Sequence, residues 1–137
     1  MIAYLDSGVL LHAWRGSDLS GAALAAMSAE KRELVTSQLV RLELLPKPAC
    51  EKRPAETAFY AAHFEAAAPA LPLDGPLGEE ALALAQRYGL AAVDALHIAA
   101  ALRQHAGEFY TSEKPGKPMF RVKELKVISL HEITAAN

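Results

Sequence analysis

The sequence has a single cysteine, little net charge and no long hydrophobic segment, and each of these absences excludes a class of protein. Because Cys50 is the only cysteine in 137 residues, no internal disulfide can form, which favours a reducing compartment. The formal net charge of -2 argues against a protein that coats nucleic acid through bulk electrostatics. No apolar run approaches membrane-spanning length, and the first residues lack the basic and apolar segments of a secretion signal. We therefore expect a soluble, cytoplasmic protein.

The chain instead offers short apolar runs that alternate with helix-forming stretches. Its length suits one domain, 1–137, and its many Ala and Leu residues favour helices, with no repeat or interdomain linker. We predict strands at 2–5, 34–36, 108–111 and 126–130, helices at about 9–14, 19–27, 38–45 (stopped by Pro46 and Pro48), 54–68, 76–88 and 95–105, and an exposed tail at 131–137. This alternation predicts an α/β fold in which a mainly parallel sheet is covered by helices on both faces.

The first dozen residues organise the rest of the chain. Ile2 to Leu5 form an apolar run that suits a strand buried on both faces, and Asp6 ends it where apolar residues at helical spacing begin. In open α/β sheets, ligands bind at the carboxyl ends of the strands, so the carboxylate of Asp6 lies where a ligand would bind. Taken alone, Asp6 is better explained as a helix N-cap, and the positions of the other acids decide between the two interpretations.

Glu43 is an acid inside an apolar helix. It shares a face of the predicted helix 38–45 with Leu39, Val40 and Leu42, which we expect to point inward. A carboxylate buried there is costly unless it is paired or bound to a cation. The sequence leaves two interpretations open: a buried salt bridge, for example to an arginine, and a metal ligand.

Asp94 and Glu113 also follow strand-like segments. Asp94 could be only the N-cap of the helix after it, and Glu113 only a solvated loop acid. Because the carboxyl ends of parallel strands share one edge of the sheet with the helices that follow them, we expect both acids to lie near Asp6 and Glu43. Clustered carboxylates repel each other, and hard divalent cations are the usual reason to assemble them, whereas no Cys/His spacing suggests zinc. Mg²⁺ or Mn²⁺ is therefore the cofactor that we expect.

Four segments form a recognisable set: Leu5-Asp6-Ser7, Glu43 in its apolar helix, Val93-Asp94-Ala95-Leu96-His97-Ile98-Ala99, and Thr111-Ser112-Glu113 after a strand. Together they resemble the PIN domain, and most closely the small single-domain toxin ribonucleases of the VapBC toxin–antitoxin systems. The resemblance covers essentially the whole chain, and its most specific piece is the Asp-Ala-x-His-Ile-Ala segment. The chain departs from the pattern at Glu113, where such proteins usually carry Asp or Asn.

The resemblance implies a three-layer α/β/α fold, Mg²⁺- or Mn²⁺-dependent endoribonuclease activity, a homodimer, and neutralisation by a small VapB-like antitoxin. The residues that it implies as metal ligands and catalytic groups are Asp6, Glu43, Asp94 and Glu113. An acid-bound metal can lower the pKa of a water, orient it for in-line attack on a phosphodiester and stabilise the leaving oxygen. Ser7 or Thr111 could orient a ligand or a water, or could serve only local turns.

His97 and a group of basic residues complete the expected site. His97 is one helical turn after Asp94, and we expect a core or supporting residue rather than the general base. Residues 114–126 hold five basic side chains against Glu124, a local charge of +4; they are Lys114, Lys117, Arg121, Lys123 and Lys126. The candidate RNA contacts are Lys114, Lys117 and Arg121, and a solvated charged face is the alternative.

Two other functions compete with the nuclease. A phosphatase of the haloacid dehalogenase type also starts with an apolar strand and an Asp, but it needs a second acid two residues later, where this chain has Gly8, so we reject it. A non-catalytic PIN-like module that binds a protein or a nucleic acid need not retain all the acids, and this chain has every one. Metal-dependent cleavage of RNA by the purified, partner-free protein separates these two possibilities.

Overall fold

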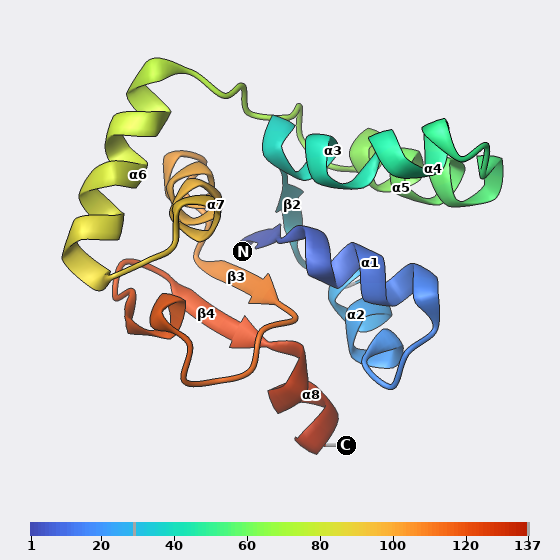
Figure 1. Ribbon diagram of the computed structural model, residues 1–137. Helices are drawn as coiled ribbons and strands as arrows, with labels where there is room; N and C mark the ends of the chain where they lie inside the picture. Colours follow the sequence, from blue (N-terminus) through green and yellow to red (C-terminus); the bar gives the residue numbers. More distant parts are fainter. Residues whose placement is uncertain (29, 137) are drawn as a thin grey trace.

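A sheet of parallel strands lies at the centre of the protein. The structure is a computed structural model that describes residues 1–28 and 30–136. In these residues the strands are β1 (Ile2–Leu5), β2 (Glu33–Val35), β3 (Glu108–Thr111) and β4 (Lys126–Ser129). They lie in the order β2-β1-β3-β4, and every neighbouring pair is parallel (Figure 1). The carboxyl ends of all of them therefore meet at one edge.

Helices cover both faces of this sheet. They are α1 (Ser7–Arg15), α2 (Ser20–Met27), α3 (Gln38–Leu44), α4 (Pro46–Cys50), α5 (Pro54–Ala66), α6 (Gly75–Tyr88), α7 (Ala92–Arg103), α8 (Leu130–Ala136) and the 3₁₀ turn η1 (Pro118–Arg121). Helices α1, α2 and α8 lie on one side of the sheet, and α6 and α7 on the other (Figure 1). Their apolar side chains belong to two separate buried clusters. The predicted three-layer α/β/α fold with a parallel sheet is confirmed. None of the described helices is long and apolar enough to cross a membrane.

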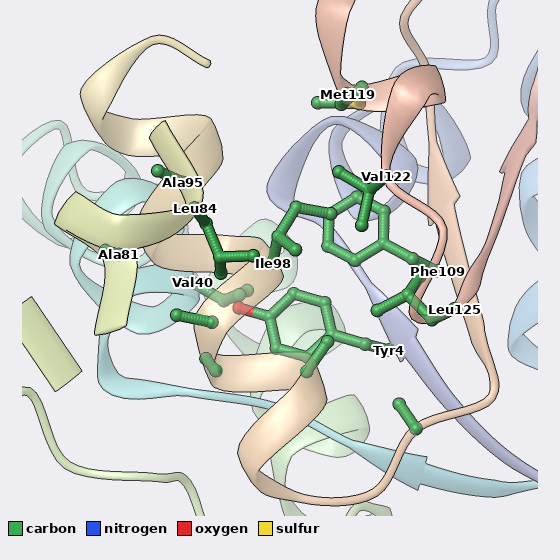
Figure 2. Packing of buried hydrophobic residues seen from close by; sticks show 14 of the residues in the cluster. Tyr4, Val40, Ala81, Leu84, Ala95, Ile98, Phe109, Met119, Val122 and Leu125 are labelled. Carbon is green, nitrogen blue, oxygen red and sulfur yellow. The ribbon is translucent and has the colours of Figure 1, made fainter. Parts of the chain in front are cut away.

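The alternation of side chains along β1 explains the two layers. Ala3 and Leu5 are fully buried against the α1 and α2 side. Tyr4 lies between them and points to the opposite face, where its ring stacks on Phe109 with the centroids 5.3 Å apart. Figure 2 shows the two rings among buried side chains of α6 and α7, including Ile98. The central strand is thus buried on both faces, as its uninterrupted apolar run predicts.

Helix α3 ends before Pro46, as predicted, but the sequence did not predict the short helix α4 that begins there. Proline is favourable as the first residue of a helix, because that position needs no N–H donor. A second prediction is contradicted. The segment predicted as an exposed tail forms helix α8, and Leu130 at its start is fully buried. Asn137, the last residue of that prediction, lies outside the described residues. Burial of Leu130 with α1 and α2 explains why the segment folds onto the sheet.

Candidate active site

Four carboxyl groups lie at the edge of the sheet where the parallel strands end. Asp6 directly follows β1, and Glu113 lies two residues beyond β3. Glu43 belongs to α3, which starts after β2, and Asp94 to the first turn of α7. Burial raises the pKa of Asp94, and the charges of Glu113 and Glu43 raise it further. The structure therefore brings the four predicted acids within electrostatic reach of one another.

Asp6 is held rigidly between the sheet and α1. Its side chain is only 9% exposed, and Oδ1 accepts a hydrogen bond of 3.2 Å from the backbone N–H of Val9, so the N-cap interpretation is confirmed. The hydroxyl of Thr111 also hydrogen-bonds to this carboxyl group. Burial is the main cause that raises the pKa of Asp6 to about 6, and the nearby charge of Asp94 adds to it. Asp6 can therefore cap α1 and also belong to the group of four acids.

Asp94 is not the helix cap that the sequence predicts. Helix α7 begins at Ala92 and its N-cap is Ala91, so the segment 90–93 is not a strand-like link and Asp94 is the third helical residue. An acid is favourable both at the cap and in the first turn, because both places face the positive end of the helix dipole, and the sequence cannot separate them. Asp94 instead lines a cavity of about 480 Å³ together with Glu113 and Lys117.

Glu43 lies at the rim of the core rather than inside it. The predicted inward face of α3 is wrong in part, because Leu42 is 61% exposed and the Glu43 side chain 35% exposed. The partner of Glu43 is a histidine rather than an arginine, and the contact is a hydrogen bond: Nε2 of His97 lies 2.7 Å from Oε1 of Glu43, and the hydroxyl of Ser7 donates to the same oxygen at 2.5 Å. The hydrogen bond to His97 is the main cause that lowers the pKa of Glu43. Glu43 is therefore an oriented anion.

A line of hydrogen bonds connects Glu43 to the core. Nδ1 of His97 lies 2.8 Å from the hydroxyl of Tyr4, which lies 2.7 Å from the hydroxyl of Ser37, the N-cap of α3. Because an ionised Glu43 can only accept, we infer that His97 donates through Nε2 and accepts the Tyr4 proton at Nδ1. Both ring nitrogens are then used, which agrees with a supporting role for His97. No local sequence pattern predicts this network, because its members are far apart in the chain.

The absence of a side chain at Gly8 allows the loop after β3 to approach the start of α1. A Cβ atom added to Gly8 would lie 2.1 Å from Oγ of Ser112 and 3.4 Å from Oδ1 of Asp6. Thr111 is fully buried, and its Oγ1 accepts a hydrogen bond of 3.1 Å from the backbone N–H of Glu113. Thr111 thus ties the Glu113 loop to Asp6. The sequence interpretation named Thr111 but missed Gly8 as a residue that the close approach requires.

The basic residues of 114–126, which we predict to lie beside the acids, lie in different places on the protein. Lys117 faces the cavity that Asp94 and Glu113 line, and Lys114 is exposed in the same loop. Arg121 uses Nη1 to donate to the carbonyl oxygen of Tyr88 at 3.1 Å. Lys126 is the first residue of β4 and therefore lies at the opposite edge of the sheet, so grouping it with the acids is wrong.

The residues at this edge fit a hard divalent cation. All four acids offer oxygen ligands, and a cation would relieve the burial and repulsion that raise the pKa values of Asp6 and Asp94. Within residues 1–28 and 30–136, no three acidic, histidine or cysteine side chains form a group that could hold an ion as they stand. Glu43 is already held by His97 and Ser7, so rotation of the exposed Glu113 side chain would be needed to close the ligand set.

Several solved structures share this fold at low sequence identity. A chain of VapBC2 from Rickettsia felis, solved with promoter DNA, is 16% identical with a TM-score of 0.70, over 94% of this chain and 98% of that one. FitAcB from Neisseria gonorrhoeae is 21% identical with a TM-score of 0.65, over 96% and 99%. VapC20 of Mycobacterium tuberculosis, described as a toxin that cleaves the sarcin–ricin loop, is 16% identical with a TM-score of 0.66, over 90% and 98%.

Sequence comparison assigns the family more directly than these structures do. No protein of curated function matches the sequence. The sequence model of one family, the PIN domain, matches residues 3–114, which include most of β1, all of β2 and β3, and all four acids. The match covers most of the chain, and it agrees with the resemblance seen in the motifs. This chain belongs to the PIN domain family.

Proposed function

We propose that this chain, as one nuclease domain over residues 1–137, is a Mg²⁺- or Mn²⁺-dependent endoribonuclease and the VapC-like toxin of a cytoplasmic type II toxin–antitoxin pair. The observation that carries the proposal is the convergence of the four acids at one edge of the sheet. Nucleases of the PIN domain family generally use divalent metal ions. Two of the similar structures are a VapBC complex and a toxin that cleaves an RNA loop, which supports RNA as the substrate.

In this proposal the chain's own residues prepare the site. Asp6, Glu43 and Asp94 would hold the ion, with Glu113 completing the set. Such an ion supplies a nucleophilic water at neutral pH and stabilises charge on the leaving oxygen of the phosphodiester. Ser7 and His97 both hold Oε1 of Glu43, and Oε2 has no hydrogen-bond partner among the described residues. The fixed oxygen orients the carboxylate, and the other remains available as a ligand.

RNA cleavage by the purified, partner-free protein is expected to require Mg²⁺ or Mn²⁺. Excess chelator should abolish cleavage, and adding the metal back should restore it, because no alternative nucleophile is proposed at this edge. The measurement is the cleavage of an RNA panel on denaturing gels. Full activity in protein shown to be metal-free would contradict the proposed chemistry, and RNA binding without cleavage under any metal condition would favour the non-catalytic module.

A small antitoxin is expected to bind over the acids and to inhibit cleavage. An anionic edge attracts a basic side chain, and similar structures include a toxin–antitoxin complex from Klebsiella pneumoniae. The measurement is co-purification of the chain with the product of a neighbouring small gene, followed by titration of that product into the cleavage assay. A product that binds without reducing cleavage would remove the antitoxin part of the proposal and leave the nuclease part intact.

A homodimer is the third part of the proposal. Large apolar side chains remain exposed on the helices, and they include Leu42 of α3, Leu82 of α6 and Val93 of α7, which are 61%, 51% and 45% exposed. Exposed apolar surface of this kind is typical of protein interfaces. Sedimentation equilibrium of the purified chain measures the oligomeric state directly.

A further inference from the structure

A second cavity opens beside Glu43, and it shares no wall residue with the cavity that Asp94 and Glu113 line. It has a volume of about 340 Å³ and lies between α1, α3, α4 and α5, which pack together in the right half of Figure 1. Ser7 and Glu43 of the acid edge form part of its wall. The cavity is therefore continuous with the proposed active site, but none of the predicted basic residues contributes to it.

Two basic residues in the wall of this cavity have no acidic partner among the described residues. Its carboxylates are already engaged, because Glu43 accepts from Ser7 and His97, and the buried Glu56 accepts from Tyr60 at 2.8 Å and lies 2.9 Å from Arg53. Arg53 also pairs with Glu51 at 2.6 Å. The remaining charged residues of the wall, Arg15 and Lys47, have no carboxylate partner among the described residues and are exposed. They give the cavity an unpaired positive charge beside an anionic edge.

The size and the walls of the cavity suit one nucleotide. Leu11, Leu44 and Pro48 supply apolar surface, against which a base or a ribose can pack. Sites for small organic ligands have volumes of about 300–1,000 Å³ and combine apolar walls with a few placed polar groups. Single-stranded RNA can turn its unstacked bases outward into such pockets.

We propose that this cavity binds the nucleotide next to the scissile phosphate of the RNA, with Arg15 and Lys47 contacting its backbone phosphate. The inference rests on the proposed function, because the ligand is the RNA that is cleaved. The RNA strand would cross the acids from Lys117 at one cavity to Arg15 and Lys47 at the other. Cations on both sides of the acids offset the repulsion between the carboxylates and the phosphate backbone.

The test is RNA binding by the double variant R15Q/K47Q, compared with a control that loses the same charge elsewhere. The control is K31Q/K126Q, because both lysines are exposed and lie at the amino-terminal edge of the sheet, away from the cavity. All proteins carry D6N so that the RNA stays intact. Fluorescence anisotropy with a short, labelled, single-stranded RNA of mixed sequence is measured with Mg²⁺ while salt is raised from about 0.05 to 0.2 M.

We expect R15Q/K47Q to weaken binding by about tenfold and to reduce the slope of log K against log salt by about 0.7, the contribution of one phosphate contact to a single strand. The control should change the affinity by less than about twofold. Equal losses in the two variants, or no loss in R15Q/K47Q, would overturn the inference even if the parent chain cleaves RNA. An unaffected RNA affinity with a weakened antitoxin complex would assign the cavity to the antitoxin and also overturn it. If R15Q/K47Q loses binding as expected, but the chain without the D6N substitution never cleaves RNA, only the proposed activity is refuted.

Discussion

The variant D6N is expected to be more stable than its parent at neutral pH in the presence of chelator, by about 3 kcal/mol. Asn caps a helix as well as Asp and can keep the hydrogen bond to the N–H of Val9. It does not carry the buried charge whose desolvation raises the pKa of Asp6 from 3.8 to about 6. A shift of about 2 units corresponds to about 3 kcal/mol at pH values above both pKa values.

The sign of this effect fixes its pH dependence. A carboxyl group whose pKa is raised on folding favours the folded state most below the unfolded pKa of 3.8, and this contribution disappears as the pH rises through about 6. The stability difference between D6N and its parent should therefore be near zero at about pH 4 and should grow up to about pH 7. Urea denaturation across this range measures it. The matched control D18N removes one exposed carboxylate outside the acid group, and it accounts for the loss of a negative charge alone.

Excess Mg²⁺ should reverse the order of the two proteins. A ligand stabilises the protein that binds it in proportion to the logarithm of the free concentration over Kd, so the parent should gain more than D6N, which has lost a proposed ligand. D6N should also lose RNA cleavage. If D6N and its parent were equally stable with chelator at neutral pH, burial of the ionised Asp6 carboxylate would not destabilise the folded protein as we expect.

The main features of the fold follow from local sequence patterns. The apolar run of β1, buried on both faces, places Asp6 at the sheet edge, and the alternation of strands and helices predicts the parallel sheet that puts Glu113 beside it. Gly16 and Gly89 end α1 and α6 with positive φ values of 68° and 72°, a conformation that glycine adopts without strain. These features were accessible because each depends on residues that are close in the sequence.

The features that escaped prediction depend on long-range contacts or on equivalent local signals. Asp94 was misplaced because the cap and the first turn of a helix favour the same residue. The orientation of Glu43 depends on His97, which is 54 residues away, and on Ser7, and no pattern within α3 indicates either partner. The family motif names the four acids that the structure brings to one edge of the sheet, but only the structure shows how Glu43 is held.

Replacing His97 by Ala is expected to weaken Mg²⁺ binding by about 10–100-fold, because partners that orient a ligand have effects of this size. His97 is 4% exposed and connects Glu43 to the hydroxyl of Tyr4. Its removal frees the carboxylate to rotate and leaves the Tyr4 hydroxyl without one of its two partners, so stability should also fall, by about 1–3 kcal/mol. A loss of stability alone would be expected of any buried residue, so the metal affinity is the decisive readout.

Two further variants separate positioning from packing. H97Q retains an N–H donor that can reach Glu43, and it should recover much of the Mg²⁺ affinity that H97A loses. Y4F removes the hydroxyl at the other end of the network and keeps the bond between His97 and Glu43, so it should lose stability by about 1 kcal/mol with little change in metal affinity. Isothermal titration of Mg²⁺ and urea denaturation with chelator give the two quantities for each protein. If H97A bound Mg²⁺ as tightly as Y4F does, His97 would contribute only to the core, and the orientation of Glu43 would have to come from Ser7.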